Sequence, residues 1–474
     1  MVENINQILD SVDGIVWGIP LIVIILFVGL LLTIRLGGLQ VANLKNALRY
    51  AIRSENEGDG DVSSFEALCT ALAATIGTGN IVGVATAIGT GGPGALFWME
   101  VAAFLGMATK YAEGLLAVKY RTVGNDGKIL GGPFYYIQCG IKERFGWNFK
   151  WLAVLFAIFG VCAGLMGIGT ITQINGIASA ANSVIPSGTF LTVGAHNISY
   201  TTAIAGLVIS LCTAFVIIGG IRRIAKVASI IVPFMGIFYI IACVTILLLN
   251  FSHISTAIET IVRAAFNPAA VTGGVVGSIF IAMQKGIARG IFSNEAGLGS
   301  APIAAAAAKT KEPVRQGLVC MTGTFIDTII ICTMTGLVIV IGGTWEPSLG
   351  LEGVNITMEA FRKGLAFIPG GATVAPYLLT VSLAFFAFTT ILGWAYYSER
   401  CLQFLIGKSK TKKLIYRWLY VAAVFIGPYL TVSAVWTIAD IFNGLMAFPN
   451  LVALILLSGI VARETKQFLA KFEK

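Results

Sequence analysis

Residues 71–94 have the sequence ALAATIGTGNIVGVATAIGTGGPG, an apolar run interrupted by glycines and by hydroxyl and amide side chains. In hydrocarbon each unpaired peptide group costs several kcal/mol, so non-helical backbone persists at membrane depth only inside protein or beside a polar cavity. The segment from Gly77 to Asn80 therefore predicts a break in a membrane-spanning helix. A break that offers a threonine, an asparagine and free amides is suited to a small ion or zwitterion.

The composition of the chain indicates a membrane protein. Hydrophobic residues make up 57% of the 474 positions and charged residues only 12%, which excludes a soluble globular protein and indicates a polytopic all-α one. The net charge of +9 lies mostly in loops, so we expect no nucleic-acid partner. The eight cysteines lie mostly in apolar runs without a CxxC pair, which predicts core residues rather than disulfides or metal ligands. The acidic N-terminus lacks the basic segment of a cleavable signal.

Apolar segments of sufficient length are repeated along the whole chain. A bilayer core needs about 20 apolar residues per helix, and this requirement predicts eleven transmembrane helices. They cover residues 14–36, 64–90, 94–118, 150–182, 200–219, 226–250, 270–297, 316–342, 374–398, 415–434 and 437–461.

The basic residues of the loops predict the orientation of the chain. With the N-terminus outside and the C-terminus in the cytoplasm, the outer segments contain only Arg263, Arg362 and Lys363 of the 32 lysines and arginines. Short cytoplasmic loops of membrane proteins are enriched in these residues. We therefore expect a multi-pass protein of the cell membrane in this orientation.

A second interrupted span lies five helices after the first. Residues 273–299, GGVVGSIFIAMQKGIARGIFSNEAGLG, contain glycines together with Gln284, Lys285 and Arg289. Two interrupted helices at equivalent places in two halves predict an inverted-repeat transporter with its substrate site near the membrane midplane. The predicted units are an extra helix and interfacial segment in 1–60, a five-helix repeat in 61–250 and a second in 251–474.

The glycines of these two spans have two possible roles. Glycines allow unusual dihedral angles at a helix break, but small residues also permit close helix packing. For Gly273, Gly274 and Gly277 packing is the favoured interpretation. For Gly77 to Asn80 the functional interpretation is favoured, because the asparagine adds a polar group.

The ninth predicted span contains two consecutive hydroxyl residues, Thr389 and Thr390, in the run FFAFTTILGW at 385–394. Two hydroxyls together with the carbonyls of a helix break would make an all-oxygen site for a hard cation. Alternatively, each threonine bonds the carbonyl four residues earlier in its own helix. From the residues alone, the second interpretation is favoured.

Ionisable and amide side chains inside spans are further functional candidates. Asp327 lies midway along the eighth span, where it could pair with Lys285 or Arg289, bind a cation or take up a proton. Glu295 is expected to cap a helix or belong to an inner gate. Gln173 could reach the central site or bond across helices.

Trp394 could form the floor of the pocket or anchor the chain at the membrane interface. An enzyme is not expected, because His196 and His253 both lie in loops and neither a GxSxG nor an HExxH motif is present. A channel is the remaining alternative to a carrier.

Three motifs resemble those of a known family: GGPGALFWM at 91–99, GGPFYYI at 131–137 and ARGIFSNEAGLGSAP at 288–302. Together they resemble the alanine or glycine:cation symporter family, the sodium:alanine symporters, over nearly the whole chain. Glu100 departs from the family, which usually has tryptophan there, and is a candidate for proton-linked function.

The resemblance implies a carrier of the amino acid, polyamine and organocation superfamily with the leucine-transporter fold. That fold is a 5+5 inverted repeat, here with one extra N-terminal helix. The implied function is symport of alanine and glycine with one sodium ion by alternating access. The alternative is a proton-coupled carrier of the same fold. Sodium is the only metal expected, and it is co-transported.

The resemblance also implies two sets of site residues. The substrate-binding set is Thr78, Gly79, Asn80, Gln173, Ile281, Ala282, Gln284 and Trp394. The sodium-binding set is the carbonyls of Ala73, Ile76 and Phe386 with the hydroxyls of Thr389 and Thr390. A single sodium ion is expected because Ala282 stands where the fold's other sodium site often has a hydroxyl.

Overall fold

The interrupted span at 64–90 forms two short helices. The first, α5 (Ser64–Thr75), begins with a capping box, in which Ser63 Oγ accepts the Glu66 N–H at 3.2 Å and Glu66 Oε2 accepts the Ser63 N–H at 2.8 Å. The helix ends before Gly77, whose backbone is extended, with φ −143° and ψ −151°. A 3₁₀ turn, η1 (Thr78–Asn80), then leads into α6 (Val82–Gly91). The predicted break is confirmed.

The computed structural model describes residues 2–53, 58–124, 129–193, 196–267, 279–407, 409–430 and 432–471. The remaining elements of its first half are α1 (Val2–Val16), α2 (Ile19–Arg35), α3 (Leu39–Ala42), α4 (Leu44–Ile52), α7 (Gly94–Lys119), β1 (Thr122–Val123), β2 (Ile129–Leu130), α8 (Pro133–Tyr135), the π-helix η2 (Tyr136–Gly140), α9 (Ile141–Phe145), α10 (Lys150–Met166), α11 (Ile171–Val184), β3 (Thr189–Val193), β4 (His196–Ser199), α12 (Tyr200–Ile217) and α13 (Ile221–Leu249). Each strand pair forms a small antiparallel hairpin.

The second half has the same helical character. Its elements are η3 (Phe251–His253), α14 (Ile254–Phe266), α16 (Ile279–Asn294), α17 (Pro302–Ala305), α18 (Pro313–Thr324), the π-helix η4 (Phe325–Cys332), α19 (Thr333–Gly342), η5 (Pro347–Leu349), α20 (Val354–Gly364), α21 (Gly371–Ile406), α22 (Lys410–Ile426), η6 (Gly427–Tyr429) and α23 (Val432–Leu469).

Within the described ranges, eight helical segments are long and apolar enough to cross a membrane. These are Gln7–Arg35, Gly94–Lys119, Lys150–Val184, Tyr200–Ile217, Ile221–Leu249, Pro313–Gly342, Gly371–Ile406 and Trp436–Leu469. Each overlaps a predicted span. Of the other three predictions, 64–90 is divided into α5 and α6, 415–434 overlaps the 17-residue α22, and 270–297 continues as α16. Gly273, Gly274 and Gly277 lie outside the described residues.

Within the described ranges, the span predicted at 150–182 has an interruption that the sequence did not predict. The span at 150–182 is divided into α10 and α11, and the backbone between them is irregular from Gly167 to Thr170. A Cβ at Gly169 would lie 2.6 Å from the Trp394 Cβ. Glycine is therefore required where this segment crosses α21.

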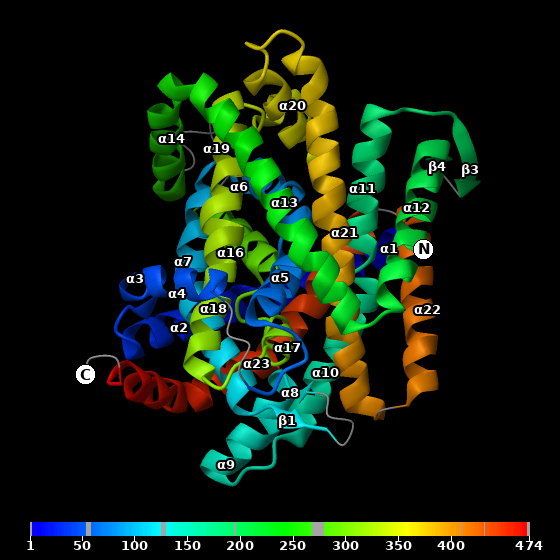
Figure 1. Ribbon diagram of the computed structural model, residues 1–474. Helices are drawn as coiled ribbons and strands as arrows, with labels where there is room; N and C mark the ends of the chain where they lie inside the picture. The colour runs from blue at the N-terminus through cyan, green and yellow to red at the C-terminus, as the bar shows by residue number, and fades with distance from the viewer. Residues whose placement is uncertain are drawn as a thin grey trace.

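The broken helices lie inside the bundle. The helix α5 packs against α13 and α21, while α6 packs along α16, and α7 covers α16 and α18. Figure 1 shows α13 and α21 crossing the middle of the molecule with α5 beside α13. The first break is therefore enclosed by protein, as its exposed peptide groups require.

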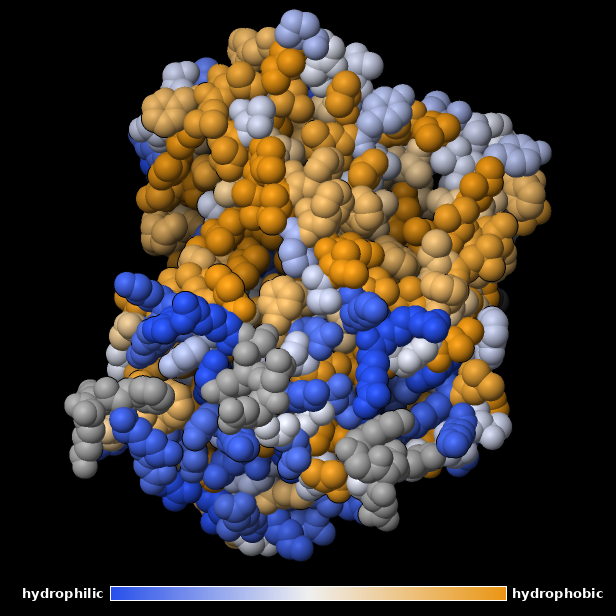
Figure 2. All heavy atoms as spheres, in the orientation of Figure 1, coloured by the Kyte–Doolittle hydropathy of each residue, from blue (hydrophilic) through white to orange (hydrophobic). Residues whose placement is uncertain are grey.

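The surface separates into an apolar and a hydrophilic part. Figure 2 shows an apolar surface over the upper part of this face and hydrophilic residues gathered at the lower end, while α20 lies at the top in Figure 1. Large apolar side chains are exposed on outer helices, including Phe215 (72%), Ile230 (66%) and Phe234 (55%). Exposed apolar area of this extent fits a protein surrounded by lipid.

Candidate functional site

The first break is held open by neutral side chains. The Gly77 N–H donates to Asn80 Oδ1 at 2.8 Å, and the Thr78 N–H donates to Gln173 Oε1 at 3.0 Å. In a continuous helix the Gly77 N–H would bond the carbonyl of Ala73, four residues earlier. The break thus lets the backbone amides of Gly77 and Thr78 bond side chains instead of carbonyls of α5.

Oxygen atoms from α5 and α21 converge beside this break. Thr390 Oγ1 donates to the Ile76 carbonyl at 3.2 Å and to the Phe386 carbonyl at 3.0 Å. Thr389 Oγ1 also lies 3.0 Å from the Phe386 carbonyl. A Cβ at Gly77 would clash with Thr390 Oγ1, so the close approach of the two helices requires glycine.

The geometry therefore agrees with both interpretations of Thr389 and Thr390, namely hydrogen bonds within their own helix and an oxygen cluster beside the first break. Thr389 bonds the carbonyl of Phe385 four residues earlier at 3.1 Å, and Thr390 bonds that of Phe386. Thr390 in addition reaches across to α5 at Ile76. Of the five predicted sodium ligands, Ile76, Phe386, Thr389 and Thr390 lie together, and Ala73 lies one turn earlier on α5.

Gln173 lies at the first break, on the first turn of α11. Its Nε2 donates to the Ile168 carbonyl at 3.0 Å while its Oε1 accepts from Thr78. The side chain therefore joins two irregular segments, the first break and the 167–170 interruption. Its predicted place beside the break agrees with the structure, and its contact with a substrate stays a prediction.

The helix α16 is not broken where we expected. It is continuous to Asn294, and irregular backbone follows, with positive φ at Glu295 (57°), Gly297 (88°) and Gly299 (79°). The glycines within α16 have another role, because a Cβ at Gly286 would clash with the Ala95 carbonyl on α7. Gly286 permits helix packing, and the irregular backbone lies at residues 295–299, the C-terminal end of the interrupted span predicted at 273–299.

As a consequence, Ile281, Ala282 and Gln284 do not lie at the first break. Gln284 Nε2 donates to the Trp17 carbonyl at 3.2 Å, and the Ala282 Cα packs at Gly91, the far end of α6. The part of α16 that meets Gly79 is its last turn, since a Cβ at Gly79 would lie 3.1 Å from the Ser293 Cα.

Ser293 lies nine residues after Gln284, which is about 13 Å along an α-helix. The structure therefore places Ile281, Ala282 and Gln284 away from the first break. Their contact with a substrate, which the family resemblance implies, stays a prediction.

Asp327 connects the two breaks. Asn80 Nδ2 donates to Asp327 Oδ1 at 2.7 Å, and Ser293 Oγ donates to Asp327 Oδ2 at 2.9 Å. Thr328 Oγ1 donates to the same Oδ2 at 2.8 Å. The π-helix η4 carries Asp327 and so places one buried carboxylate between the first break and the last turn of α16.

The ion pair considered between Asp327 and Arg289 does not form. Arg289 instead forms a two-point ion pair with Asp440 on α23, at 2.7 and 3.0 Å. The Arg289 guanidinium also lies over the rings of Phe292 and Trp436, at 5.5 and 5.4 Å. Arg289 is therefore neutralised and held at the wall of the vestibule described below.

The second break is held by carboxylates. Glu113 Oε1 on α7 accepts the N–H groups of Gly297 and Gly299 at 3.1 and 3.2 Å and Asn450 Nδ2 at 2.6 Å. Glu295 accepts Trp394 Nε1 at 2.7 Å. The backbone amides of Gly297 and Gly299 therefore already donate to a carboxylate of the protein itself. Trp394 contacts the second break through this bond.

A cavity of about 730 Å³ leads toward the first break from the end that carries α20. Its wall includes Gly176, where a Cβ would lie 2.7 Å from the Thr78 methyl group. The other lining residues belong mainly to α6, α11 and the segment 345–356. We call this cavity the vestibule. It brings bulk solvent close to the Thr78 end of the break.

The full length of the chain matches a known family. The model of the sodium:alanine symporter family covers residues 2–474. The chain belongs to this family. Sodium:alanine symporters are transporters, so the expectation that the chain is not an enzyme is confirmed.

Three relatives within this family are similar over nearly their whole lengths. The sodium/alanine symporter AgcS of Methanococcus maripaludis is 48% identical over 466 residues, which are 98% of this chain and 97% of the relative. An uncharacterized transporter of Haemophilus influenzae is 50% identical over 471 residues, 99% of this chain and 97% of the relative. The putative sodium/proton-dependent alanine carrier protein YrbD of Bacillus subtilis is 36% identical over 459 residues, 94% and 89%.

Family membership establishes the general function of this sodium:alanine symporter. It is a multi-pass membrane protein that couples transport of an amino acid such as alanine to sodium or another cation. Sodium is thus a co-substrate rather than a resident cofactor. The individual ligands of sodium and of the amino acid stay predictions.

Sequence reasoning missed three residues that the structure places at the breaks of this symporter: Glu113, Ser293 and Asn294. Glu113 is a buried ionisable residue inside a span, the same signal that drew attention to Asp327. Ser293 and Asn294 lie in the motif SNEAGLG, whose polar residues directly precede the glycines with positive φ.

Proposed function

We propose that this chain transports alanine and glycine together with sodium by alternating access across the cell membrane. The observation that carries the proposal is the convergence of the Ile76 and Phe386 carbonyls with Thr389 and Thr390 beside Gly77. Sodium is a hard cation that prefers oxygen ligands of this kind. Bound there, it would join α5 to α21 and stabilise the geometry that accepts the substrate.

The substrate carboxylate is proposed to bind at the amides of Thr78 and Gly79. The Thr78 N–H is held by Gln173 Oε1, a neutral acceptor. A carboxylate makes stronger, charge-assisted bonds than an amide oxygen, so it can replace Gln173 there. The tight contact between Gly79 and Ser293 favours a small substrate.

In this account the vestibule is the outer entrance. The orientation with the N-terminus outside puts the hydrophilic lower end of Figure 2 in the cytoplasm and α20 on the outer side. The two breaks and their halves, 61–250 and 251–474, are proposed to be the inverted repeats. Opening toward the cytoplasm then requires the contacts between Glu113 and the second break to separate.

A proton-coupled carrier is the second candidate, and Asp327 is the observation that favours it. This buried carboxylate accepts hydrogen bonds from Asn80, Ser293 and Thr328 and forms no recorded ion pair with a basic residue of the described chain. Its protonation would change its bonds to both breaks at once. Glu100, on α7, is the other acidic candidate for proton coupling.

The sodium proposal is tested by binding linkage. If sodium binds beside the substrate site, sodium must raise the affinity for alanine, and alanine must raise the affinity for sodium by the same factor. Titration calorimetry on the purified protein measures both. An alanine affinity that does not change with sodium concentration refutes the proposal. Thr389→Ala should weaken the sodium dependence.

A carrier and a channel are separated by counterflow. Proteoliposomes loaded with unlabelled alanine should take up labelled alanine transiently above equilibrium, because a carrier exchanges the two. Alanine flux without counterflow contradicts alternating access and supports a channel.

A further inference from the structure

A second cavity, of about 520 Å³, lies at the hydrophilic end of the molecule. It is formed by the turn between α12 and α13 and by the ends of α21 and α22. Its charged lining comprises five basic and two acidic side chains: Arg222, Arg400, Lys410, Lys413, Arg417, Asp61 and Glu399. We call it the basic cavity. Its lining has a surplus of positive charge that would attract an anion.

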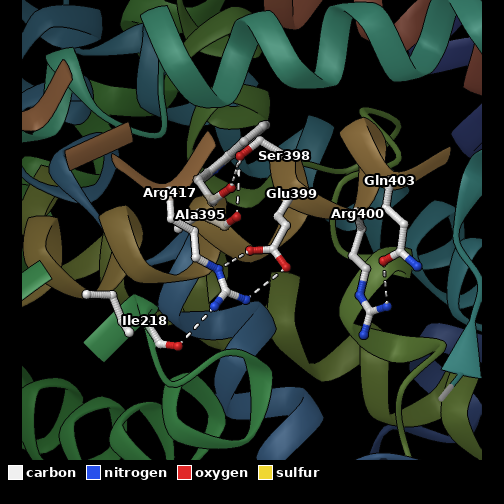
Figure 3. A network of polar contacts seen from close by, with 8 residues as sticks. Ile218, Ala395, Ser398, Glu399, Arg400, Gln403 and Arg417 are labelled. Carbon is white, nitrogen blue, oxygen red and sulfur yellow. Dashed lines mark hydrogen bonds and ion pairs between the residues drawn. The ribbon is translucent and has the colours of Figure 1, made fainter. Parts of the chain in front are cut away.

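The two acidic side chains are already used by two of the arginines. Arg417 forms a fork with Glu399 at 2.6 and 3.0 Å and donates to the Ile218 carbonyl at 2.9 Å, as Figure 3 shows. Arg400 lies 3.5 Å from Asp61. Arg222 and Lys410 have no acidic partner in the part of the chain that the structure describes.

The Arg400 pair is incomplete in a way that favours an additional ligand. Both side chains are about nine-tenths buried, with 10% and 9% exposed, yet Asp61 Oδ2 accepts no hydrogen bond. Arg400 Nη1 donates to Gln403 Oε1 at 3.2 Å, whereas its Nη2 lies 3.5 Å from Asp61 Oδ2 without a hydrogen bond between them. A phosphate oxygen would bond that guanidinium more strongly than this contact does.

Backbone groups contribute at the same place. The 29-residue helix α13 begins at Ile221, and Ile221 and Arg222 both line the cavity. The first N–H groups of a helix lack helical acceptors and favour anions. Gly220, with φ 71°, forms the turn before the helix, and a Cβ there would meet only Arg417 Nη2 at 3.5 Å. The cavity floor is therefore open to a ligand.

The surroundings of the basic cavity are apolar and exposed. Phe215 on α12 is 72% exposed, and Ile218, directly after α12, is 45% exposed. On α22, Ile415 is 55% and Trp418 53% exposed. In a membrane these side chains face lipid. A ligand with a phosphate in the cavity and hydrocarbon chains along α12 and α22 satisfies both surfaces, whereas a free anion uses only the first.

We propose that the basic cavity binds the phosphate headgroup of an anionic phospholipid. Basic pockets at the cytoplasmic ends of transmembrane helices suit such headgroups. The site also contacts the elements of the proposed transport site. Arg400 is on α21, which carries Thr390, and Asp61 precedes α5, which ends at Thr75 directly before Ile76. A headgroup that competes with Asp61 for Arg400 weakens the ion pair that links the segment before α5 to α21.

Retention of dioleoyl-phosphatidylglycerol by the purified full-length protein, measured by native mass spectrometry, tests this proposal. The test variant is Arg222→Ala/Lys410→Ala/Lys413→Ala, which keeps the Arg417–Glu399 and Arg400–Asp61 ion pairs. It should retain phosphatidylglycerol about 10- to 100-fold more weakly than the unmodified protein. Lys142→Gln, on the exposed helix α9 at the same end, is the matched control and should retain it normally.

Equal retention by the triple variant and the unmodified protein overturns the proposal. A second arm adds inorganic phosphate to the detergent-solubilised protein. If phosphate displaces phosphatidylglycerol at similar concentrations, the site is a free-anion site and the lipid assignment is wrong. Single Lys410→Ala should weaken retention in the same direction and serves if the triple variant does not fold. Lipid retention does not depend on sodium coupling, so its failure leaves the proposed transport function standing.

Discussion

The two breaks of this symporter are both irregular segments inside a helical bundle, but different groups hold them. At the first, the free amides of Gly77 and Thr78 meet the neutral side chains of Asn80 and Gln173. At the second, the amides of Gly297 and Gly299 meet the carboxylate of Glu113.

This difference separates a binding role from a structural one. A neutral acceptor can be replaced by a charged ligand with a gain in bond strength, while a buried carboxylate that loses its donors is left uncompensated. The first break is therefore suited to bind and release substrate. The second is suited to hold the closed end of the transporter. Asp327 accepts hydrogen bonds from Asn80 at the first break and from Ser293 on the last turn of α16.

Gly77→Ala should have the largest effect, because its Cβ would clash with Thr390 Oγ1 and would lie 3.0 Å from Gln173 Oε1. Overpacking at this point separates α5 from α21 and should lower sodium-driven alanine uptake by about 100-fold. Gly83→Ala, on α6 with nothing within 4 Å of its Cβ, is the matched control and should transport normally. Normal uptake by Gly77→Ala would remove the first break from the mechanism.

Glu113→Gln tests the second break. It keeps the shape but weakens the bonds to Gly297 and Gly299, so unfolding should need about 1–3 kcal/mol less free energy. Thermal denaturation measures this change, with the exposed Glu259→Gln as the control. Sodium affinity should be nearly unchanged, and a large loss of sodium affinity at unaltered stability would reverse the roles assigned to the two breaks.

Thr390→Val tests the oxygen cluster with a side chain of nearly the same shape. Loss of the hydroxyl should reduce sodium affinity by about tenfold. Thr380→Val on the same helix removes a weak 3.4 Å bond to the Ala180 carbonyl and should leave sodium affinity unaltered. Sodium titration of alanine uptake distinguishes the two variants, and identical curves would exclude Thr390 as a ligand.

The smallest effect is expected along α16. Gln284→Ala removes a bond to Trp17 far from the first break, so alanine affinity should stay within about twofold of the unmodified protein. Ser293→Ala, on the last turn, removes a donor to Asp327 and should weaken alanine or sodium binding more. If Gln284→Ala has the stronger effect on binding, the sequence-based placement of the substrate ammonium was the better one.

The sequence predicted the first break because glycine and asparagine inside an apolar run have few explanations in a membrane. The position of the second break within 273–299 could not be predicted, because the glycines of α16 and those after it look alike in sequence. Glycine is required at position 286 because α16 contacts Ala95 there, whereas Gly297 and Gly299 are glycines because their φ angles are positive. Only the packing of α16 on α7 distinguishes these reasons.

Pairwise contacts across the bundle were also beyond the sequence. The bond of Thr390 to its own helix could be predicted, but its second bond to Ile76 depends on how α5 crosses α21. The sequence offered Arg289 only as one of several possible partners of Asp327, while the three-dimensional arrangement pairs Arg289 with Asp440. The resemblance to the family implied that Thr390 and Ile76 belong to one site, but it did not supply the partner of Arg289.

The central claim is that sodium, bound where α5 meets α21, drives alanine transport. It is tested most directly by alanine uptake into proteoliposomes in which the sodium and proton gradients are imposed separately. The account predicts concentrative uptake with an inward sodium gradient, retained when the pH difference is abolished. Uptake that follows the proton gradient and does not respond to sodium would contradict it and would assign the coupling to Asp327.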